Sequence, residues 1–175
     1  AYGNMAEDVR VRYGTELTSI GAIGISAMMH GYMVFDHAGE LLVPFRTWRN
    51  TITEDAASRL TELFQYPIPQ RWTIAHLYQA ILKDEPHVKD IDYLITLEGY
   101  VHWMLTGQRV LGIGDWAGMV PVDNETKDYD ERRVRQVDQL VADRTSTWKI
   151  PDTLPKANVA VESAGRLTVE EGMSL

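Results

Sequence analysis

Two short segments of the chain carry side chains suited to binding a small polar ligand. In the first, Ser26–Gly31, His30 offers a neutral donor and acceptor for hydroxyl groups, and Gly31 permits close approach of the backbone. The second, Arg46–Asn50, sets an indole beside a guanidinium and an amide. Small-molecule sites join an apolar surface to a few placed polar groups, which these segments could supply. On residue types alone, a backbone-bonded role explains His30 equally well, and core packing is the favoured interpretation of Trp48.

Other kinds of chemistry have no matching motif. The sequence contains no GxxxxGK phosphate loop, no HExxH metal motif and no GxSxG nucleophile elbow. Cysteine is absent, which excludes disulfides and thiolate metal sites. The histidines are scattered without metal-ligand spacing, at His30, His37, His76, His87 and His102. We therefore assign no catalytic residue, metal ligand or cofactor ligand to this chain.

Composition narrows the class of protein. The 175 residues are 45% hydrophobic and 24% charged, as in a globular domain or a large part of one. A formal net charge of −8 argues against binding to a nucleic-acid backbone. No apolar run approaches the roughly 20 residues of a membrane helix, and the polar N-terminal residues differ from a signal peptide. We expect a cytoplasmic protein with neither nucleic acid nor membrane as a partner.

The elements that must position the two segments include both strands and helices, so the predicted fold class is α/β. Ile20–Ser26 is a short apolar run typical of a strand buried on both faces. Ser26–Gly31 would then lie at the carboxyl end of a strand, where ligands collect in open α/β sheets. Residues 32–35 and 40–43 predict a hairpin with its turn at Gly39, and residues 45–48 a further strand.

The rest of the chain has a helical period. We predict helices from Asn4 to Gly14, from an N-cap at Thr53, from Thr73 to Leu82, from about Asp90 to Thr106 and from Tyr129 to Arg144. The last of these should bury Val134, Val137, Leu140 and Val141. A capping-box pattern over Thr168–Glu171 indicates one more helix start, and residues 67–69 and 123–128 read as loops.

The order of these motifs resembles that of the FGGY carbohydrate kinases. Residues 23–31 read IGISAMMHG and residues 42–51 read LVPFRTWRNT, similar to the family stretch IGISGQMHG…LLD..G.PLRPAILWNDTRT. Residues 93–107, YLITLEGYVHWMLTG, resemble the family helix LLPKDYLRYRLTGE, and residues 114–123, GDWAGMVPVD, resemble SDASGTLLFD. The order and spacing agree over roughly residues 5–172.

This resemblance implies an actin-like, ribonuclease H-like domain that binds a sugar in a cleft against a second domain holding ATP. The implied reaction is ATP- and Mg²⁺-dependent phosphorylation of a sugar hydroxyl, with a ketopentose such as xylulose or ribulose ahead of gluconate and rhamnulose. Met29 and His30 match the sugar-contacting Met-His of the family. Trp48 and Asn50 match the Trp and Asp of WND, and Asp115 matches the Asp of SDAS. These five residues are the candidate substrate-binding residues.

Several positions depart from the family pattern. Ala27 and Met28 replace a Gly-Gln pair, and Asn50 and Ile52 replace the Asp and Arg of WNDTR. In the SDASGT match the replacements are Trp116, Ala117 and Met119. The identity of the sugar is therefore open.

The family's Asp-x-Gly-Thr phosphate loop and its later aspartate base have no counterpart in residues 1–175. By this comparison the chain is a fragment of the N-terminal sugar-binding domain, without its opening strands, and should neither bind ATP nor catalyse alone. The rest of the kinase and a second copy pairing on an exposed sheet edge are its expected partners. A non-catalytic sugar-binding or regulatory module, or a structural protein with Met28, Met29 and Trp48 in its core, are the alternatives.

Overall fold

A computed structural model describes residues 2–145, 147–160 and 162–168, and these residues form both helices and strands. In chain order the elements are α1 (Tyr2–Tyr13), β1 (Met33–Phe35), α2 (Glu54–Phe64), α3 (Thr73–Leu82), the 3₁₀-helix η1 (Pro86–Asp90), β2 (Tyr93–Ile95), α4 (Leu97–Thr106), β3 (Val110–Gly112), α5 (Ile113–Trp116), β4 (Val122–Asp123), β5 (Asp128–Tyr129), α6 (Glu131–Val141), α7 (Ile150–Thr153) and β6 (Lys156–Asn158). The α/β class predicted from the sequence is confirmed.

The strands form three sheets of two strands each within the described residues. β1 pairs antiparallel with β2 in the register Val34↔Leu94, β3 pairs parallel with β6 in the register Leu111↔Ala157, and β4 and β5 form a short hairpin. The first sheet separates two hydrophobic clusters because side chains alternate across a strand. Val34 and Leu94 face the main core, whereas Met33, Phe35, Tyr93 and Ile95 pack with aromatic residues of α4.

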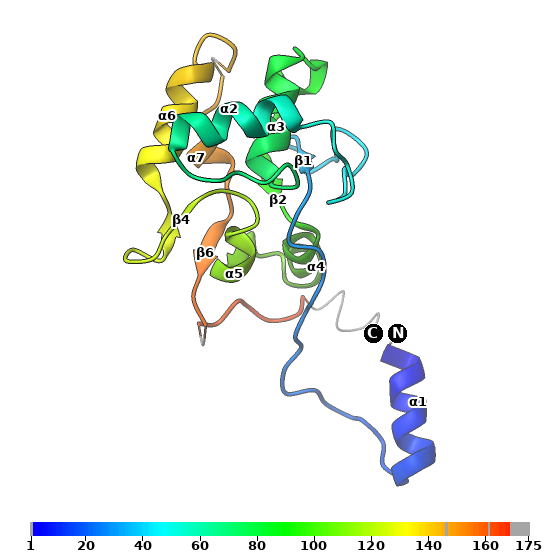
Figure 1. The fold of residues 1–175 in the computed structure, drawn as a ribbon. Helices are drawn as coiled ribbons and strands as arrows, with labels where there is room; N and C mark the ends of the chain where they lie inside the picture. Colours follow the sequence, from blue (N-terminus) through cyan, green and yellow to red (C-terminus); the bar gives the residue numbers. More distant parts are fainter. Residues whose placement is uncertain (1, 146, 161, 169–175) are drawn as a thin grey trace.

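Helix α3 is the centre of the main core, and all but one of its residues are buried. Helix α2 packs on it through Ala56, Ala57, Leu60 and Phe64, and α6 contributes Val134, Val137 and Val141. Leu140 was predicted to join them, but its exposed fraction is 51% because it lies outside the narrow buried stripe of α6. Figure 1 shows α1 standing apart from this body at the end of an extended stretch.

The strand predicted over residues 20–26 is wrong. This stretch has no regular secondary structure, and the exposed fraction of Ile23 is 47%. A strand exists only through a neighbour that accepts and donates its backbone hydrogen bonds, and the described residues place none there. The single mixed sheet expected over residues 20–48 is therefore not formed, and the ribonuclease H-like sheet implied by the resemblance stays a prediction.

The predicted hairpin is present in reduced form. Gly39 turns the chain at a φ of 84°, and Leu42 N donates to Val34 O at 2.9 Å. Its second arm makes a single bridge, Phe35↔Leu41, and the strand predicted over residues 45–48 is likewise reduced to the bridge Tyr32↔Arg46. The other edge of β1 pairs with β2.

Two helix boundaries differ from those predicted. The helix expected from Asp90 begins only at Leu97, because Tyr93–Ile95 forms a strand and the hydroxyl of Thr96 then caps α4 by accepting Gly99 N–H at 3.2 Å. The end at Gly107 is as predicted, in the left-handed region at a φ of 69°. The helix expected over 129–144 is shorter, since Asp130 caps α6 by accepting Arg133 N–H.

The remaining helix predictions fare unevenly. Helix α2 begins after Thr53 as predicted, but the Thr53 hydroxyl does not cap it and donates instead to Gln70 O at 2.6 Å. Helix α3 spans the predicted residues, and α1 begins two residues before the expected Asn4. The helix start predicted over Thr168–Glu171 lies beyond Thr168 outside the described residues.

Candidate functional site

Gly31 anchors the first predicted segment to the start of α3. Its N–H donates to Arg71 O at 3.0 Å, and its carbonyl oxygen accepts the Thr73 hydroxyl at 2.8 Å. Its φ of 115° is one that side-chain-bearing residues rarely adopt, and an added Cβ would clash with the carbonyl oxygen of Arg46. The backbone at Gly31 is therefore in close contact with Arg46 of the same chain, and its close approach to a ligand stays a prediction.

Met29 and His30 pack against the turn that follows α5. His30 Nδ1 lies 3.3 Å from Gly118 O, across a long separation in sequence. A Cβ on Gly118 would lie 2.7 Å from His30 Nδ1 and closer still to the Met29 carbonyl oxygen, so glycine is needed there. The structure thus brings Met29 and His30 together with the helix that carries Asp115.

Burial lowers the pKa of His30 below its usual range, and the nearby Arg71 charge also lowers it. The contact with Gly118 O acts in the opposite direction. The ring is accordingly neutral near pH 7. A neutral imidazole that faces a carbonyl oxygen with Nδ1 must carry its proton there, which leaves Nε2 as an acceptor. The backbone-bonded interpretation and the ligand interpretation of His30 are therefore compatible.

Trp48 and Asn50 lie in the loop that follows Arg46. Trp48 is 50% exposed, with the Arg49 guanidinium 5.2 Å from its ring centroid, so it does not pack in the core. Asn50 Oδ1 accepts Ile52 N–H at 3.1 Å and shapes the loop. This loop starts beside Gly31, because Arg46 pairs with Tyr32 through both backbone hydrogen bonds. The two predicted segments are thus neighbours.

A partly buried ion pair fixes the loop to the start of η1. Arg46 Nη1 donates to Glu85 Oε1 at 3.1 Å, and Nη2 donates to Oε2. Glu85 also lies 3.5 Å from His87 Nδ1, and His87 Nε2 lies 2.9 Å from the Tyr32 hydroxyl. His76 of α3 is fully buried and stacks on the Tyr32 ring, with 6.0 Å between the ring centroids. The guanidinium of Arg46 therefore holds the loop in place.

Asp115 forms a pair with a carboxylate that sequence reasoning missed. Burial, followed by a hydrogen bond and repulsion from Glu98, raises the pKa of Asp115 to about 7. Glu98 Oε2 in turn accepts Ala27 N–H at 3.3 Å. Glu98 looked like an ordinary acidic residue in the first turn of a helix. No local signal identifies its partner, because the fold alone brings α4 and α5 together.

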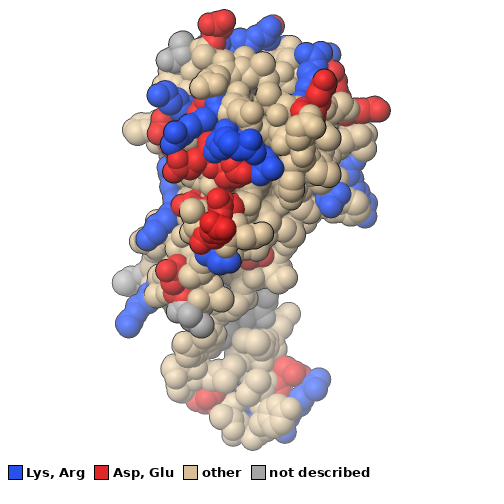
Figure 2. Space-filling view, turned by 60° about the vertical axis from the view of Figure 1, so that its left-hand side comes forward, with Lys and Arg blue, Asp and Glu red and all other residues tan. Residues whose placement is uncertain are grey.

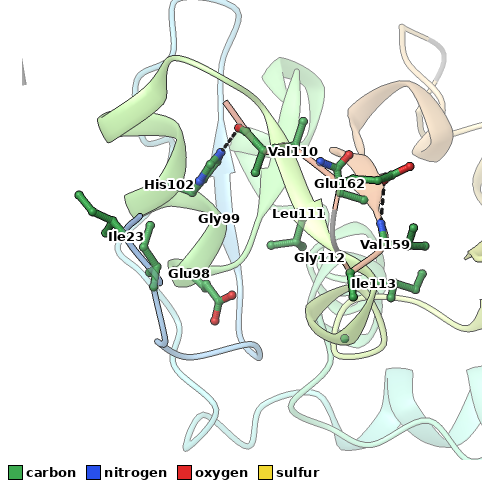
Figure 3. A pocket seen from close by; sticks show the side chains of 15 residues that line it. Ile23, Glu98, Gly99, His102, Val110, Leu111, Gly112, Ile113, Val159 and Glu162 are labelled. Carbon is green, nitrogen blue, oxygen red and sulfur yellow. Dashed lines mark hydrogen bonds between the residues drawn. The ribbon is translucent and has the colours of Figure 1, made fainter. Parts of the chain in front are cut away.

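A cavity of about 430 Å³ opens beside this pair (Figure 3). Figure 3 shows Glu98, Gly99 and His102 of α4 facing the strand and turn at Val110–Ile113. His102 Nε2 lies 2.8 Å from Ala164 O, and Glu162 Oε2 accepts Val159 N–H at 2.9 Å. The cavity is of the size that small-molecule sites have. The sequence predicted none of its lining residues as site residues.

Two general features of the described residues bear on partners. No group of three or more His, Asp or Glu side chains in that part of the chain could hold a metal ion. None of its helices has the length and apolar character needed to cross a membrane. Figure 2 shows basic and acidic side chains interspersed over the face in view, rather than gathered by sign.

Comparison with known proteins identifies the fold. No protein-family model matches the chain, and no curated protein matches it significantly. A xylulose kinase from Lactobacillus acidophilus is similar in structure with a TM-score of 0.75 and 19% identity, covering 99% of this chain and 34% of that one. A gluconate kinase from the same organism has a TM-score of 0.72 and 20% identity, covering 89% of this chain and 31% of that one. For the Plasmodium falciparum glycerol kinase they are 0.72 and 14%, covering 99% and 36%.

This chain thus spans about a third of the length of these solved structures. Their identities to it are low, so the likeness concerns the fold, and function has to be argued from the site. The resemblance to FGGY carbohydrate kinases seen in the sequence is confirmed at the level of fold. Over most of its length, the chain has the fold of one part of an FGGY-type sugar kinase.

Proposed function

We propose that this chain is the sugar-binding portion of an ATP-dependent carbohydrate kinase of the FGGY family. The observation that carries the proposal is the structural likeness to xylulose, gluconate and glycerol kinases. The packing of Met29 and His30 on the turn after α5 supports it, because residues matched to two separate family motifs meet there. The chain then represents part of the N-terminal domain, and the rest of the kinase is its partner.

The chemistry of the site suits sugar placement. Neutral His30 offers Nε2 as an acceptor for a sugar hydroxyl, and the exposed indole of Trp48 offers an apolar wall. Phosphoryl transfer depends mostly on positioning and on stabilisation of charge. In this proposal ATP and Mg²⁺ supply the phosphoryl group and its charge neutralisation, and the remainder of the enzyme holds both. Residues of this chain would position the acceptor hydroxyl.

The substrate we propose is a ketopentose, with xylulose and ribulose first and gluconate next. Titration of D-xylulose, D-ribulose, gluconate and glycerol into the chain, followed by calorimetry, tests this order. We expect one of the two ketopentoses to bind most tightly. Equal binding of all four, or binding of none by the folded chain, would contradict the proposal.

A second measurement separates a kinase portion from a non-catalytic sugar-binding module. The isolated chain should form no sugar phosphate from ATP, Mg²⁺ and any of these sugars. Added to the remaining two thirds of a related kinase as a separate polypeptide, it should restore turnover. Turnover by the chain alone would overturn the assignment of the phosphate chemistry to the rest of the enzyme.

A further inference from the structure

Four polar side chains form a closed network beside the start of the loop that carries Trp48. The Tyr32 hydroxyl lies 2.9 Å from His87 Nε2, and His87 Nδ1 lies 3.5 Å from Glu85 Oε2. The same Glu85 oxygen accepts Nη2 of Arg46, and Glu85 Oε1 accepts Nη1 at 3.1 Å. The Arg46 guanidinium in turn lies 5.3 Å from the centroid of the Tyr32 ring. Each member of the network therefore contacts the next.

The network is largely shielded from water. Tyr32 and His87 are buried. The side chains of Arg46 and Glu85 are 16% and 23% exposed. A polar group in such surroundings destabilises the fold unless it has a partner, and here each member has its partner within the network. A change at one member should therefore be felt by the others.

These contacts determine which nitrogen of His87 carries the proton. A carboxylate has only acceptor oxygens, and a neutral imidazole has one donor and one acceptor. Nδ1 faces Glu85 and so carries the proton, which leaves Nε2 to accept the Tyr32 hydroxyl. Burial lowers the pKa of His87 below its usual range. The Arg46 charge also lowers it, whereas Glu85 and Asp90 act in the opposite direction. The imidazole is therefore neutral near pH 7.

The network holds one end of the loop that carries Trp48. The backbone of Arg46 pairs with Tyr32 in both directions, at 2.8 and 3.2 Å, and its side chain belongs to the network. Beyond Arg46 the loop is bonded to itself, with Asn50 N–H donating to Thr47 O at 2.9 Å. Trp48 is half-exposed, so the core does not fix its indole. The orientation of the indole therefore depends on the anchor at Arg46.

We propose that His87 is a positioning residue for sugar binding. Through Nδ1–H and Nε2 it aligns Glu85 with Arg46 and holds Tyr32, so that Trp48 presents its indole to the sugar in one orientation. The network itself rests on the contacts described above. Its consequence for sugar affinity rests on the proposed function.

Nitrogen-15 magnetic resonance of the His87 imidazole at pH 7 tests the proton assignment, with His87→Asn used to assign its signals. The tautomer of a histidine is set by the partners of its two nitrogens, so we expect Nδ1 to be the protonated one. A proton on Nε2, or on both nitrogens, would overturn the proposal.

Two variants separate the two nitrogens, because an Asn amide can take the place of Nδ1 and a Gln amide can reach the place of Nε2. His87→Asn keeps a donor for Glu85. The indole N–H signal of Trp48, assigned with Trp48→Phe, should then stay in place. His87→Gln loses that donor, so this signal should shift or broaden. His37→Asn, at an exposed histidine, is the control and should leave the signal unchanged.

Binding of D-xylulose gives a separate result. We expect the dissociation constant to rise roughly threefold or more in His87→Gln, as for one weakened hydrogen bond, and to stay within about twofold in His87→Asn. If His87→Gln folds poorly, Glu85→Asp replaces it, because its shorter side chain draws the carboxylate back from Arg46 and His87.

Either an unmoved Trp48 signal or an unchanged affinity in the folded variant would contradict the proposal, as would equal effects of His87→Asn and His87→Gln. If no sugar binds to the unmodified chain, the proposed function fails. The tautomer and the Trp48 signal then still decide whether His87 positions the loop.

Discussion

His76 is buried in the centre of the core, yet neither of its ring nitrogens has a hydrogen-bond partner among the described residues. Burial lowers its pKa from 6.5 to about 4, and the nearby Arg46 charge acts in the same direction. A proton on the folded protein is therefore less favourable than one on the unfolded chain. This makes His76 a source of acid instability rather than a ligand.

The sign of the pH dependence follows from this lowered pKa. Between pH 6.5 and 4 the unfolded chain binds a proton at His76 that the folded chain does not, so stability falls as the pH falls. The full shift corresponds to about 3 kcal/mol. Urea unfolding should show that the free energy of unfolding falls between pH 7 and pH 4 in both proteins. We expect the fall to be smaller in His76→Leu than in the unmodified chain, by about this amount. Equal losses in both proteins would contradict the assignment, and exposed His37→Leu is the control.

Gly118 is a position at which a single added carbon atom should lower the stability of the protein. In Gly118→Ala the added Cβ would meet Met29 O and His30 Nδ1, so the segment must move. We expect a loss of about 1–3 kcal/mol of stability, as overpacking usually costs. Gly114→Ala, within the short helix α5 that precedes Gly118, meets nothing within 4 Å and should be neutral or slightly stabilising. The idea fails if thermal unfolding of the two variants is alike.

The ion pair between Arg46 and Glu85 joins the loop that carries Trp48 to the start of η1. Glu85→Gln should leave a largely buried guanidinium without its counter-charge, at a cost of roughly 2–4 kcal/mol. Asp55→Asn breaks the exposed pair with Arg59 and should cost less than about 1 kcal/mol. Chemical unfolding of both variants compares the two losses of stability. A smaller loss in Glu85→Gln than in Asp55→Asn would contradict a stabilising role for the pair between Arg46 and Glu85.

Helices were predicted better than strands for a physical reason. Helices α2, α3 and α6 make their hydrogen bonds within the segment, so a local pattern with a clear apolar face suffices. Tyr93–Ile95 was assigned to a helix because its apolar residues also fit a helical period, and only the partner strand β1 decides otherwise. Residues 20–26 are the opposite case: their pattern predicts a strand, but they form none because the described residues give them no partner strand.

The site was predictable to a similar degree. Met29, His30 and the neighbouring loop were found because chemically distinctive residues cluster in sequence. Glu98 was missed because its meaning depends on α4 lying against α5, which no short-range pattern encodes. Trp48, Asn50 and Asp115 remain proposed sugar contacts, each with a structural environment now defined.

For the whole molecule, the exposed apolar run at 20–26 bears on association. Unpaired, extended, apolar backbone favours pairing with another strand. We therefore expect the chain to self-associate, as seen by sedimentation well above micromolar concentration. Ile23→Lys should shift the equilibrium towards monomer, whereas Val11→Lys, at an exposed position of α1, should not. A monomer at all concentrations would remove this expectation.

If His30 contacts the sugar as proposed, His30→Ala should bind D-xylulose more weakly than the unmodified chain. One hydrogen bond to a neutral group contributes on the order of 0.5–1.5 kcal/mol, so the dissociation constant should rise roughly three- to tenfold. The melting temperature is measured on the same preparation, so that affinity refers to folded protein. The predicted result is weakened sugar binding by a folded variant. Unchanged affinity together with a large drop in melting temperature would contradict the claim and leave His30 a structural residue.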